Sequence, residues 1–519
     1  MKACFFLQRR FVYLGHQMAI LLQEKYGVKE FCGYVSLRSS LDFLQKQKDI
    51  NYSQLILEED IYARYKDEEV DPDFLRSFAD KYGIPNLWPY VLLDRVLRHN
   101  LLVRAYPADE SRYSHEDLMK IFQVTAKAVL KFLDEEKPDF IFFSIVSNLG
   151  SYLLYEVAKK KGIKTLWTFE ARVGVLETVS ESHDKHTYLD SAIEYIKQHN
   201  DEPKVRDSCE KAKVFLKTFQ EKPFYFMKDS EAASKYAQSV ATPLYHFRFL
   251  GSRNIWKSFC WFFKSHYDYF VNKHKDKNDY STIKPWLEAW DKIIRKMRIL
   301  RGYKDLYNKI DSKEDYAYFN LHTEPEALFP FSAPFFTDQQ WVISQVARSL
   351  PLHYKLYVKD HPQMFGKRPR SYYKKLKKIP NVKIIDPSVS SLMLTQNSNI
   401  VITITGTSGW EGVLLKKPTI LFGDVFYSQL SAVKVCGDIT KLPFLVKEQL
   451  ENFVYNKNDL LYFLSGLFME SVALDISQIW DEEGASMMDK KKEALAPLVD
   501  LIARKIGLHD ASELMKIEQ

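Results

Sequence analysis

The sequence has few cysteines, and no arrangement of them would hold a metal ion or a disulfide framework. The five cysteines are scattered along 519 residues, and none forms a CxxC pair or lies in a histidine cluster. Structural zinc is therefore not expected, and a chain of this length does not depend on disulfide bonds to build a core. These features indicate a protein of the reducing cytosol, and we expect no metal and no cofactor.

Long apolar runs and a strong net charge are also missing. No stretch of about 18 uncharged apolar residues occurs, so a membrane-spanning helix is not expected. Arg9 and Arg10 follow the apolar run 3–7, whereas a secretion signal would place them before it. The net charge of +7 is small beside 74 Lys and Arg residues, so no nucleic acid partner is indicated. We expect a cytoplasmic protein whose membrane contact is peripheral, at the inner face of the cell membrane.

What the sequence does contain is an alternation of apolar runs and helical stretches. In the N-terminal part, the runs expected to form strands are 3–7, 31–35, 139–145 and 164–169. Between the second and third runs, the sequence is charged and is predicted to be mostly helical as far as about residue 125. The last two runs enclose a helix that starts near Asn148, which predicts a right-handed parallel crossover.

A second set of apolar runs follows a basic, aromatic and helical region. These runs are 316–321, 354–358, 382–385, 400–405 and 419–422. Both sets predict doubly wound parallel sheets, so the expected fold class is α/β with two Rossmann-like domains. The expected boundaries are 1–200 for the first domain, 201–309 for a helical connector, 310–447 for the second domain and 448–519 for a helical tail that packs across the domains.

Two such domains place a ligand cleft at the carboxyl ends of their strands, and three polar clusters follow strands of the second domain. The first cluster is Asn320-Leu321-His322-Thr323-Glu324-Pro325-Glu326. Here His322 and Glu326 could orient a sugar, hold a phosphate or exchange a proton. The alternative is a turn set by Pro325, in which Glu326 favours a helix N-terminus.

The second cluster is Lys359-Asp360-His361-Pro362, directly after a strand. The proline restricts the backbone of His361, so its ring and the neighbouring Lys359 are suited to bind a phosphate oxygen. The basic segment 367–378 that follows is interpreted as a solvated helix face rather than as a second binding site.

The third cluster, TITGTSGWEG at 403–412, lies between a strand and a helix. Its glycines, Gly409 among them, let the backbone approach a ligand, and the helix N-terminus favours an anion. Thr407 and Ser408 add hydroxyl groups. Glu411, one turn inside the helix, is suited to bind a ribose hydroxyl, or it only complements the helix dipole. A Walker loop is excluded because no Gly-Lys-Ser/Thr follows.

The order of these motifs resembles the capsule polysaccharide biosynthesis family of bacterial glycosyltransferases, which includes transferases of the eight-carbon acid Kdo. The motifs are LHTEPE at 321–326, KDHP at 359–362, TGTSGWEG at 405–412 and KKPTILFG at 416–423. The resemblance is densest over 316–423. It extends more weakly to the N-terminal half, at 139–141, near Gly150 and at 170–174.

The resemblance implies a metal-independent glycosyltransferase of GT-B architecture, with the sugar nucleotide held mainly by the second domain and the acceptor side formed by the first. By analogy, the residues that would bind the nucleotide and its phosphate are Lys359, His361, Thr407, Ser408, Gly409 and Glu411. His322 and Glu326 would face the reacting sugar. Glu170 and Glu326 are candidate general bases, and Arg172 is a candidate partner for a substrate carboxylate.

The expected function is sugar transfer in the assembly of capsule or another surface polysaccharide. The donor would be a nucleotide-activated sugar such as Kdo or a related acidic sugar, with CMP favoured as the nucleotide and UDP or GDP as alternatives. The acceptor would be a glycan or a lipid-linked glycan. Two other functions stay open: a sugar-nucleotide epimerase, which needs no acceptor, and a non-catalytic glycan-binding or export protein of the same fold.

Aromatic residues make up 14% of the chain, and many of them gather at 253–275 among lysines. This composition is typical of a segment at a membrane interface, and such a contact would suit a lipid-linked acceptor. The aromatic residues cover most faces of the predicted helix, however, so a packed connector helix is the favoured alternative.

Overall fold

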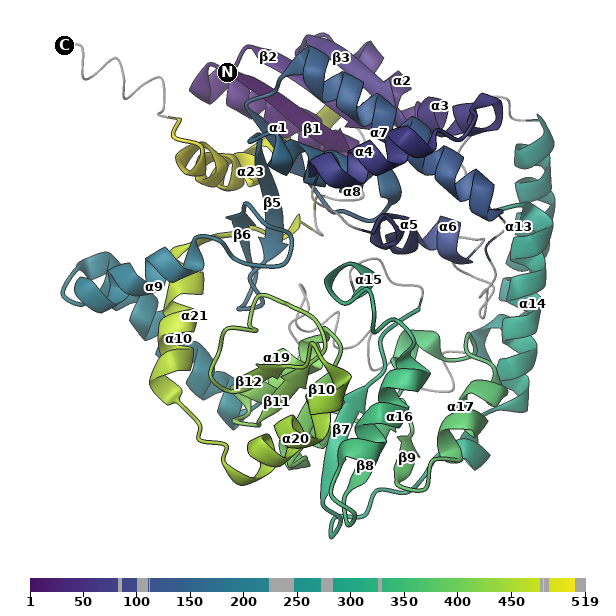
Figure 1. The fold of residues 1–519 in the computed structure, drawn as a ribbon, viewed down its shortest axis with the longest axis vertical. Coiled ribbons are helices and arrows are strands. Elements are labelled where there is room, and N and C mark those ends of the chain that lie inside the picture. Colours follow the sequence, from purple (N-terminus) through teal and green to yellow (C-terminus); the bar gives the residue numbers. More distant parts are fainter. Residues whose placement is uncertain are drawn as a thin grey trace.

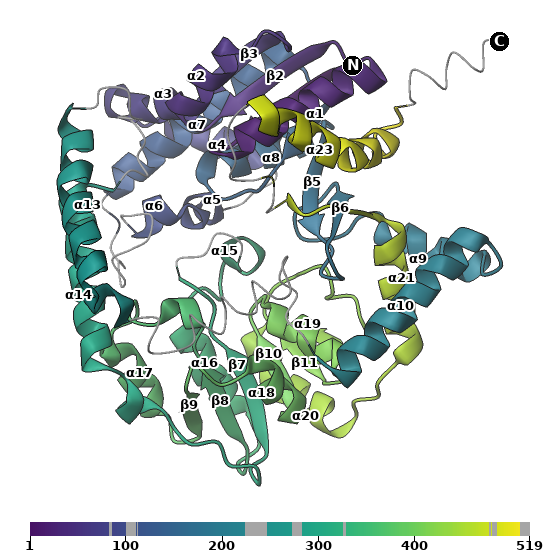
Figure 2. The same ribbon diagram turned by 180° about the vertical axis from the view of Figure 1, so that it is seen from behind.

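The computed structural model describes residues 1–82, 86–99, 111, 113–223, 247–271, 283–324, 329–476, 479 and 485–508. The chain forms two lobes, each built around one sheet, and the carboxyl ends of the two sheets face each other (Figures 1 and 2). None of the helices in these ranges is long and apolar enough to cross a membrane.

The N-terminal lobe contains a seven-stranded sheet in the order β13-β6-β5-β4-β1-β2-β3. Its strands are β1 (Lys2–Leu7), β2 (Glu30–Val35), β3 (Tyr52–Leu57), β4 (Phe140–Phe143), β5 (Lys164–Glu170), β6 (Leu176–Ser180) and β13 (Ser471–Ala473). The strands from β3 to β5 are parallel, whereas β6 and β13 add antiparallel pairs at one edge. The parallel part has the Rossmann strand order 3-2-1-4-5, so its topological switch point lies between β1 and β4.

The C-terminal lobe contains a six-stranded parallel sheet in the order β12-β11-β10-β7-β8-β9. Its strands are β7 (Tyr316–Asn320), β8 (Lys355–Lys359), β9 (Val382–Ile385), β10 (Ile400–Thr403), β11 (Thr419–Leu421) and β12 (Val433–Val435). Counted from β7, this is the complete Rossmann order 3-2-1-4-5-6. The switch point of this lobe therefore lies between β7 and β10.

Each sheet is covered on both faces, because alternate side chains of its strands pack into different cores. In β1, Cys4 and Phe6 pack into one core, whereas Ala3, Phe5 and Leu7 pack into the other. The helices of the N-terminal lobe are α1 (Phe11–Tyr26), α2 (Arg38–Lys46), α3 (Glu58–Ala63), α4 (Pro72–Tyr82), α5 (Trp88–Leu93), α6 (Arg95–His99), α7 (His115–Glu136) and α8 (Leu149–Lys160). Those of the C-terminal lobe are α15 (Phe329–Ser332), α16 (Gln339–Ser349), α17 (Arg370–Lys377), α18 (Ser391–Asn397), α19 (Thr407–Leu414) and α20 (Leu442–Glu451).

Two groups of helices link the lobes at opposite edges of the molecule (Figure 1). At one edge, α9 and α10 pack against α21; at the other, α13 and α14 stand together as a column. Near the C-terminus, the chain returns to the N-terminal lobe, where α23 packs against α1. The bounds of these helices are α9 (Leu189–Gln198), α10 (Pro203–Glu221), α13 (Ser252–Val271), α14 (Pro285–Arg301), α21 (Lys457–Met469) and α23 (Ala485–Lys505).

The α/β fold class with two Rossmann-like units is confirmed, as is the parallel crossover from β4 through α8 to β5. The prediction of mostly helical sequence from 36 to 125 missed a strand, because β3 lies within this range. β3 is the edge strand of its sheet and has polar residues in its first half, so it lacks the continuous apolar run of a buried strand. The strands β6, β12 and β13 were also not predicted.

The favoured interpretation of 253–275 as a packed helix is wrong for the described residues. No residue of α13 is buried. The physical reason is that α13 rests mainly on α14, which covers one side of it and leaves the aromatic side chains of the other sides exposed.

Candidate active site

A cavity of about 580 Å³ lies between the two lobes. On the N-terminal side it is lined by Phe11 and residues 144–146, which follow β1 and β4. On the C-terminal side it is lined by residues 320–323 and 405–407, which end or follow β7 and β10. The switch points of both sheets therefore open into one cavity, and such points are where open α/β sheets bind ligands. The volume is in the usual range for small-molecule sites.

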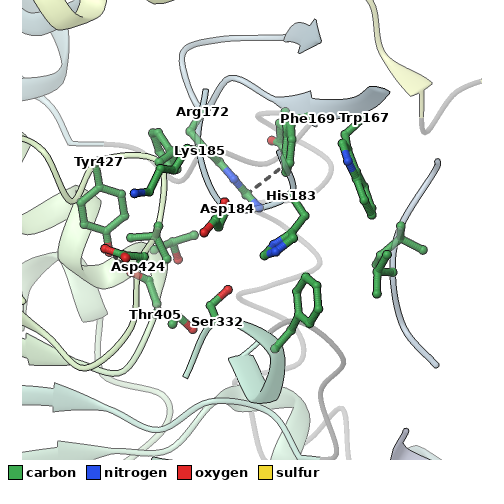
Figure 3. Close-up of a pocket in the computed structure, with 18 of the residues that line it drawn as sticks. Trp167, Phe169, Arg172, His183, Asp184, Lys185, Ser332, Thr405, Asp424 and Tyr427 are labelled. Atoms are coloured by element: carbon green, nitrogen blue, oxygen red, sulfur yellow. Dashed lines mark hydrogen bonds and ion pairs between the residues drawn. The ribbon is translucent and has the colours of Figure 1, made fainter. Parts of the chain in front are cut away.

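The turn after β5 supplies two charged groups to the cavity. Glu170 and Arg172 both line it, with Arg172 Nη1 3.3 Å from Glu170 Oε2. The backbone of Arg172 is left-handed, with φ of 56°, and its carbonyl accepts a hydrogen bond from Nε1 of Trp410 in the other lobe, at 3.1 Å. This anchored turn holds the guanidinium at the cavity (Figure 3), where it is suited to bind a carboxylate or a phosphate.

A second loop of the N-terminal lobe, after β6, was missed from the sequence. It brings His183, Asp184, Lys185 and His186 to the cavity. Figure 3 shows Asp184 and His183 between Arg172 on one side and Ser332 and Thr405 of the other lobe on the opposite side. The signal that could have revealed this loop is its run of ionisable residues, Glu181-Ser182-His183-Asp184-Lys185-His186.

Burial determines the charge of the two histidines in this loop. Burial lowers the pKa of His183 and of His186 to about 4, so both rings are neutral near pH 7. The His183 ring packs on Phe331, with 3.7 Å between the ring centroids. Asp184 accepts a hydrogen bond from the hydroxyl of Ser182. The loop thus brings two neutral rings, the Asp184 carboxyl group and the Lys185 ammonium group to the cavity, and a carboxylate in a ligand cavity is suited to accept a proton.

His322 lies in the C-terminal wall of the cavity, at the end of β7. Its Nε2 is 3.4 Å from both Thr403 Oγ1 and the backbone nitrogen of Thr405. Its own backbone N–H donates to Gln339 Oε1 at 2.7 Å. The ring therefore ties the end of β7 to the end of β10, and it positions the loop that leads into α19.

His361 also lines the cavity, and its hydrogen bond defines its tautomer. The ring Nδ1 accepts a hydrogen bond from the backbone N–H of Gln363 at 3.2 Å. Nδ1 then carries no proton, so the neutral ring is protonated on Nε2. His361 is thus a hydrogen-bond donor fixed at the start of a short 3₁₀ turn, which agrees with its predicted role at a phosphate.

The N-terminus of α19 is at the cavity, and no side chain caps it. The N-cap residue is Gly406, where an added Cβ would lie 2.6 Å from Thr403 Oγ1, so a glycine permits this close approach. Thr407 lines the cavity beside it. The buried hydroxyl of Ser408 has no hydrogen-bond partner among the described residues. An uncapped helix N-terminus with a neighbouring hydroxyl is suited to bind an anion.

Four of the residues predicted to bind nucleotide, Lys359, Ser408, Gly409 and Glu411, are buried behind the cavity wall. Burial lowers the pKa of Lys359 to about 8, and it raises the pKa of Glu411 to about 8. Gly409 packs under Tyr427, whose hydroxyl oxygen would lie 2.4 Å from an added Cβ. In this structure the four residues support the wall, and their contact with a nucleotide stays a prediction.

The interpretation of 367–378 as a solvated face needs correction at Arg368, which is fully buried. Its guanidinium forms ion pairs with Asp360 and with Glu324, the latter at 3.1 Å. It also donates to the carbonyl oxygen of His322 at 2.6 Å. One buried arginine therefore joins the loop after β7 to the loop after β8, and the KDHP and LHTEPE motifs are held together through it.

Several buried polar atoms at the cavity have no hydrogen-bond partner in the described part of the protein. They are Ser144 Oγ, Trp167 Nε1, His183 Nδ1, both ring nitrogens of His186 and Asn320 Oδ1. Buried polar atoms in proteins are nearly always satisfied. Their gathering at one cavity indicates a polar ligand.

The structure brings Glu170, Arg172, His322, His361 and Thr407 to one cavity, as predicted by their positions after strands. Glu326 lies outside the described residues, so its role stays a prediction. Within the described ranges, no three His, Cys, Asp or Glu side chains group together as ligands for a metal ion.

Residues 268–431 match the capsule polysaccharide biosynthesis protein family. The matched stretch contains β7 to β11 and the loops that follow them, including His322, His361 and Thr407. A comparison with curated proteins gave no match.

Among solved structures, the chain is similar to KpsC of Thermosulfurimonas dismutans, a beta Kdo 2,7 transferase, at 9% identity and a TM-score of 0.34, over 72% of this chain and 89% of that one. It is also similar to UDP-GlcNAc 2-epimerase from Methanocaldococcus jannaschii, at 13% identity and a TM-score of 0.25, over 90% of this chain and 98% of that one. A third similar structure is the N-terminal domain of Candida albicans trehalose-6-phosphate phosphatase, at 10% identity and a TM-score of 0.29, over 97% of this chain and 96% of that one. These values are low, so the functional argument rests on the family match and on the site itself. The resemblance drawn from the sequence motifs is confirmed over residues 268–431, the part of the chain that matches the capsule polysaccharide biosynthesis protein family.

Proposed function

We propose that the protein is a glycosyltransferase of capsule or other surface-polysaccharide assembly that takes its sugar from a nucleotide-activated donor. The observation that carries the proposal is the cavity shared by the switch points of both sheets. One wall has an uncapped helix N-terminus and a histidine donor, and the facing wall has carboxylates and a guanidinium. The family match supports the assignment to capsule polysaccharide biosynthesis.

In this proposal, the donor phosphate binds at the C-terminal wall. His361 Nε2, the Thr407 hydroxyl and the N–H groups that begin α19 donate hydrogen bonds to its oxygens. When the bond between the sugar and the phosphate breaks, negative charge grows on the departing nucleotide. Donors that are already oriented stabilise this charge in the transition state, and in the proposed mechanism they take the place of a metal ion.

The acceptor binds at the N-terminal wall. Its hydroxyl oxygen attacks the anomeric carbon, and its proton passes to a carboxylate acting as general base. Glu170 is ion-paired with Arg172, whereas Asp184 projects between the two walls (Figure 3), so Asp184 is the favoured base among the described residues. Glu170 and Glu326 stay alternatives, and His322 holds the wall in place near the reacting sugar.

The choice of sugar and nucleotide follows the resemblance to the capsule polysaccharide biosynthesis family, and one charged group of the site suits it. Arg172 is suited to bind the carboxylate of an acidic sugar such as Kdo, and sugars of this class fit a CMP donor. UDP- and GDP-sugars are the alternatives. A lipid-linked glycan as acceptor would place the protein at the inner face of the cell membrane, with 253–275 as the contacting segment.

The test is a thermal-shift screen of the purified protein with CMP, UDP, GDP and their sugar conjugates. We expect one nucleotide class to raise the unfolding temperature, because a ligand that binds only the folded state stabilises it. His361→Asn is the sharpest variant, since its side-chain oxygen can still accept from Gln363 N–H while the Nε2 donor is lost.

The matched control is His353→Ala, because His353 is exposed and lies before β8, away from the cavity. The shift should vanish in His361→Asn and persist in His353→Ala. No shift with any nucleotide, or an undiminished shift in His361→Asn, would contradict the proposed site.

A further inference from the structure

The α13–α14 hairpin exposes more large apolar side chains than its own fold requires. On α13, these side chains are Trp256, Phe259, Phe263, Tyr267 and Phe270, and between 53% and 69% of each is exposed. Their spacing of three and four residues places them on one face of the helix. A continuous exposed apolar stripe of this length on a folded protein marks a surface that contacts a partner or a membrane.

The second helix carries a matching stripe. On α14 it comprises Trp286, Trp290, Ile293, Met297 and Leu300, which are between 42% and 59% exposed. At the end of the hairpin, the rings of Phe270 and Trp286 stack with 6.3 Å between their centroids. This contact joins the two stripes, which we call the aromatic face.

Apart from the Phe270–Trp286 stack at the end of the hairpin, the aromatic face does not hold the two helices together. The half-buried positions of α13 are mostly small or polar and include Ser258, Trp261 and Ser265. The ammonium group of Lys292 on α14 lies 3.0 Å from the centroid of the Trp261 ring. Most of the hairpin is therefore joined along a different side, and the side chains of the aromatic face remain exposed on the column that α13 and α14 form (Figures 1 and 2).

The α13–α14 hairpin carries a net positive charge, which indicates the kind of surface that it binds. Residues 252–271 and 284–301 contain nine Lys or Arg and three Asp or Glu. Two of the three acids are ion-paired within α14, Glu288 with Lys292 and Asp291 with Arg295. The surplus is strongly positive, which complements an anionic surface.

We propose that the α13–α14 hairpin docks on an anionic lipid bilayer. The aromatic face enters the headgroup region, where Trp and Tyr rings are favoured, while the lysines and arginines contact the lipid phosphates. Since neither helix can cross a membrane, the hairpin lies on the bilayer surface. The role of this contact, to bring the cavity to a lipid-linked acceptor, rests on the proposed function, but the contact itself uses no residue of the cavity.

The test is flotation of the full-length protein with vesicles of phosphatidylcholine alone or mixed with phosphatidylglycerol. We expect the protein to float with the mixed vesicles and to remain largely unbound with the neutral ones. The aromatic variant Trp256→Ser, Phe263→Ser, Phe270→Ser should lose this binding. The charge variant Lys257→Glu, Lys264→Glu should bind mixed vesicles at least about tenfold more weakly, because each basic group near an anionic surface contributes a few-fold in affinity.

The matched control replaces three side chains that are at least as exposed but lie elsewhere: Phe335→Ser, Phe444→Ser, Val454→Ser, with exposures of 77%, 74% and 80%. It should float as the unmodified protein does. Equal flotation of the aromatic variant and the control would overturn the proposal. So would a dimer in light scattering that the aromatic variant abolishes while no vesicle is bound, since the face would then cover a second copy of the chain.

The thermal-shift screen separates this inference from the proposed function. The aromatic variant should keep the nucleotide-induced shift of the unmodified protein. A protein that responds to nucleotide but never floats would refute only the lipid contact, and one that floats but never responds to nucleotide would refute only the transferase assignment.

Discussion

Glu411 offers a test of the electrostatics behind the cavity wall, because its carboxyl group is buried and has a pKa raised to about 8 by that burial. In the unfolded chain its pKa is the ordinary 4.5. Between these two values, the folded protein keeps a proton on Glu411 that the unfolded chain releases. The contribution of Glu411 to stability is therefore fully present below about pH 4.5 and is lost as the pH rises towards 8.

The size of the effect follows from the shift. Each pH unit between the two pKa values lowers the free energy of unfolding by about 1.4 kcal/mol through this one group. Lys359 adds little slope below about pH 7, since its lowered pKa of about 8 leaves it protonated in both states there. Glu411→Gln keeps the shape of the protonated side chain and cannot ionise. Its stability advantage over the unmodified protein should therefore grow by about 3 kcal/mol over two pH units.

The assay is denaturant unfolding of both proteins at about pH 5.5, 6.5 and 7.5, where the groups common to both cancel in the difference. Glu451→Gln, at an exposed position near the end of α20, is the control and should show a gap that does not change with pH. A constant gap for Glu411→Gln would refute the buried, protonated carboxyl group. A gap that shrinks with rising pH would likewise contradict the raised pKa of Glu411.

Two further predictions concern the packing of the site. Asp360→Asn should lower the free energy of unfolding by about 3–5 kcal/mol, because the buried guanidinium of Arg368 then loses one of its two carboxylate partners and keeps only Glu324. A loss below about 1 kcal/mol in denaturant unfolding would show that Arg368 is not held as described. Gly409→Ala should lower the free energy of unfolding by about 1–3 kcal/mol, because the added methyl group overpacks against Tyr427. Gly437→Ala is the control and should be nearly neutral, since no atom lies within 4 Å of an added Cβ there. Equal losses of stability in the two variants would contradict the close packing at Gly409.

The strands that could be predicted from the sequence are those buried on both faces. β4 and β8 form continuous apolar runs because helices cover both sides of a parallel sheet. The strands that were missed are at or near the edges. β3 is half polar, and β12 and β13 have three residues each, too short for an alternation of apolar and polar residues to stand out.

The site was predicted where its loops follow recognisable strands. His322, His361 and Thr407 were placed by this rule, and they line the cavity. The loop with Asp184 was missed because the strand before it, β6, pairs antiparallel outside the βα rhythm of the lobe.

Which side of a helix faces the ligand was harder to predict than where the helix begins. The residues of α19 that follow Thr407, including Ser408 and Glu411, are buried behind the wall, because the helix turns away from the cavity after its first residue. The three motifs of the C-terminal lobe were recognised one by one, but the buried Arg368 that joins two of them was not. Its partner Asp360 is eight residues away in the sequence, but its partner Glu324 is 44 residues away. A local sequence pattern does not reveal a pairing over the longer distance.

Product analysis distinguishes nucleotide-dependent glycosyl transfer in the cavity between the lobes from the alternative reactions. The nucleotide sugar that gives the largest thermal shift is incubated with the protein, with and without a glycan acceptor, and the products are separated by mass. We expect the nucleotide to be released only when the acceptor is present, with the sugar joined to the acceptor. Asp184→Asn should lower the turnover rate about 10²- to 10⁴-fold while nucleotide binding persists. A rearranged sugar that is still attached to its nucleotide, formed without any acceptor, would contradict the account and identify an epimerase; binding without any turnover would identify a non-catalytic protein.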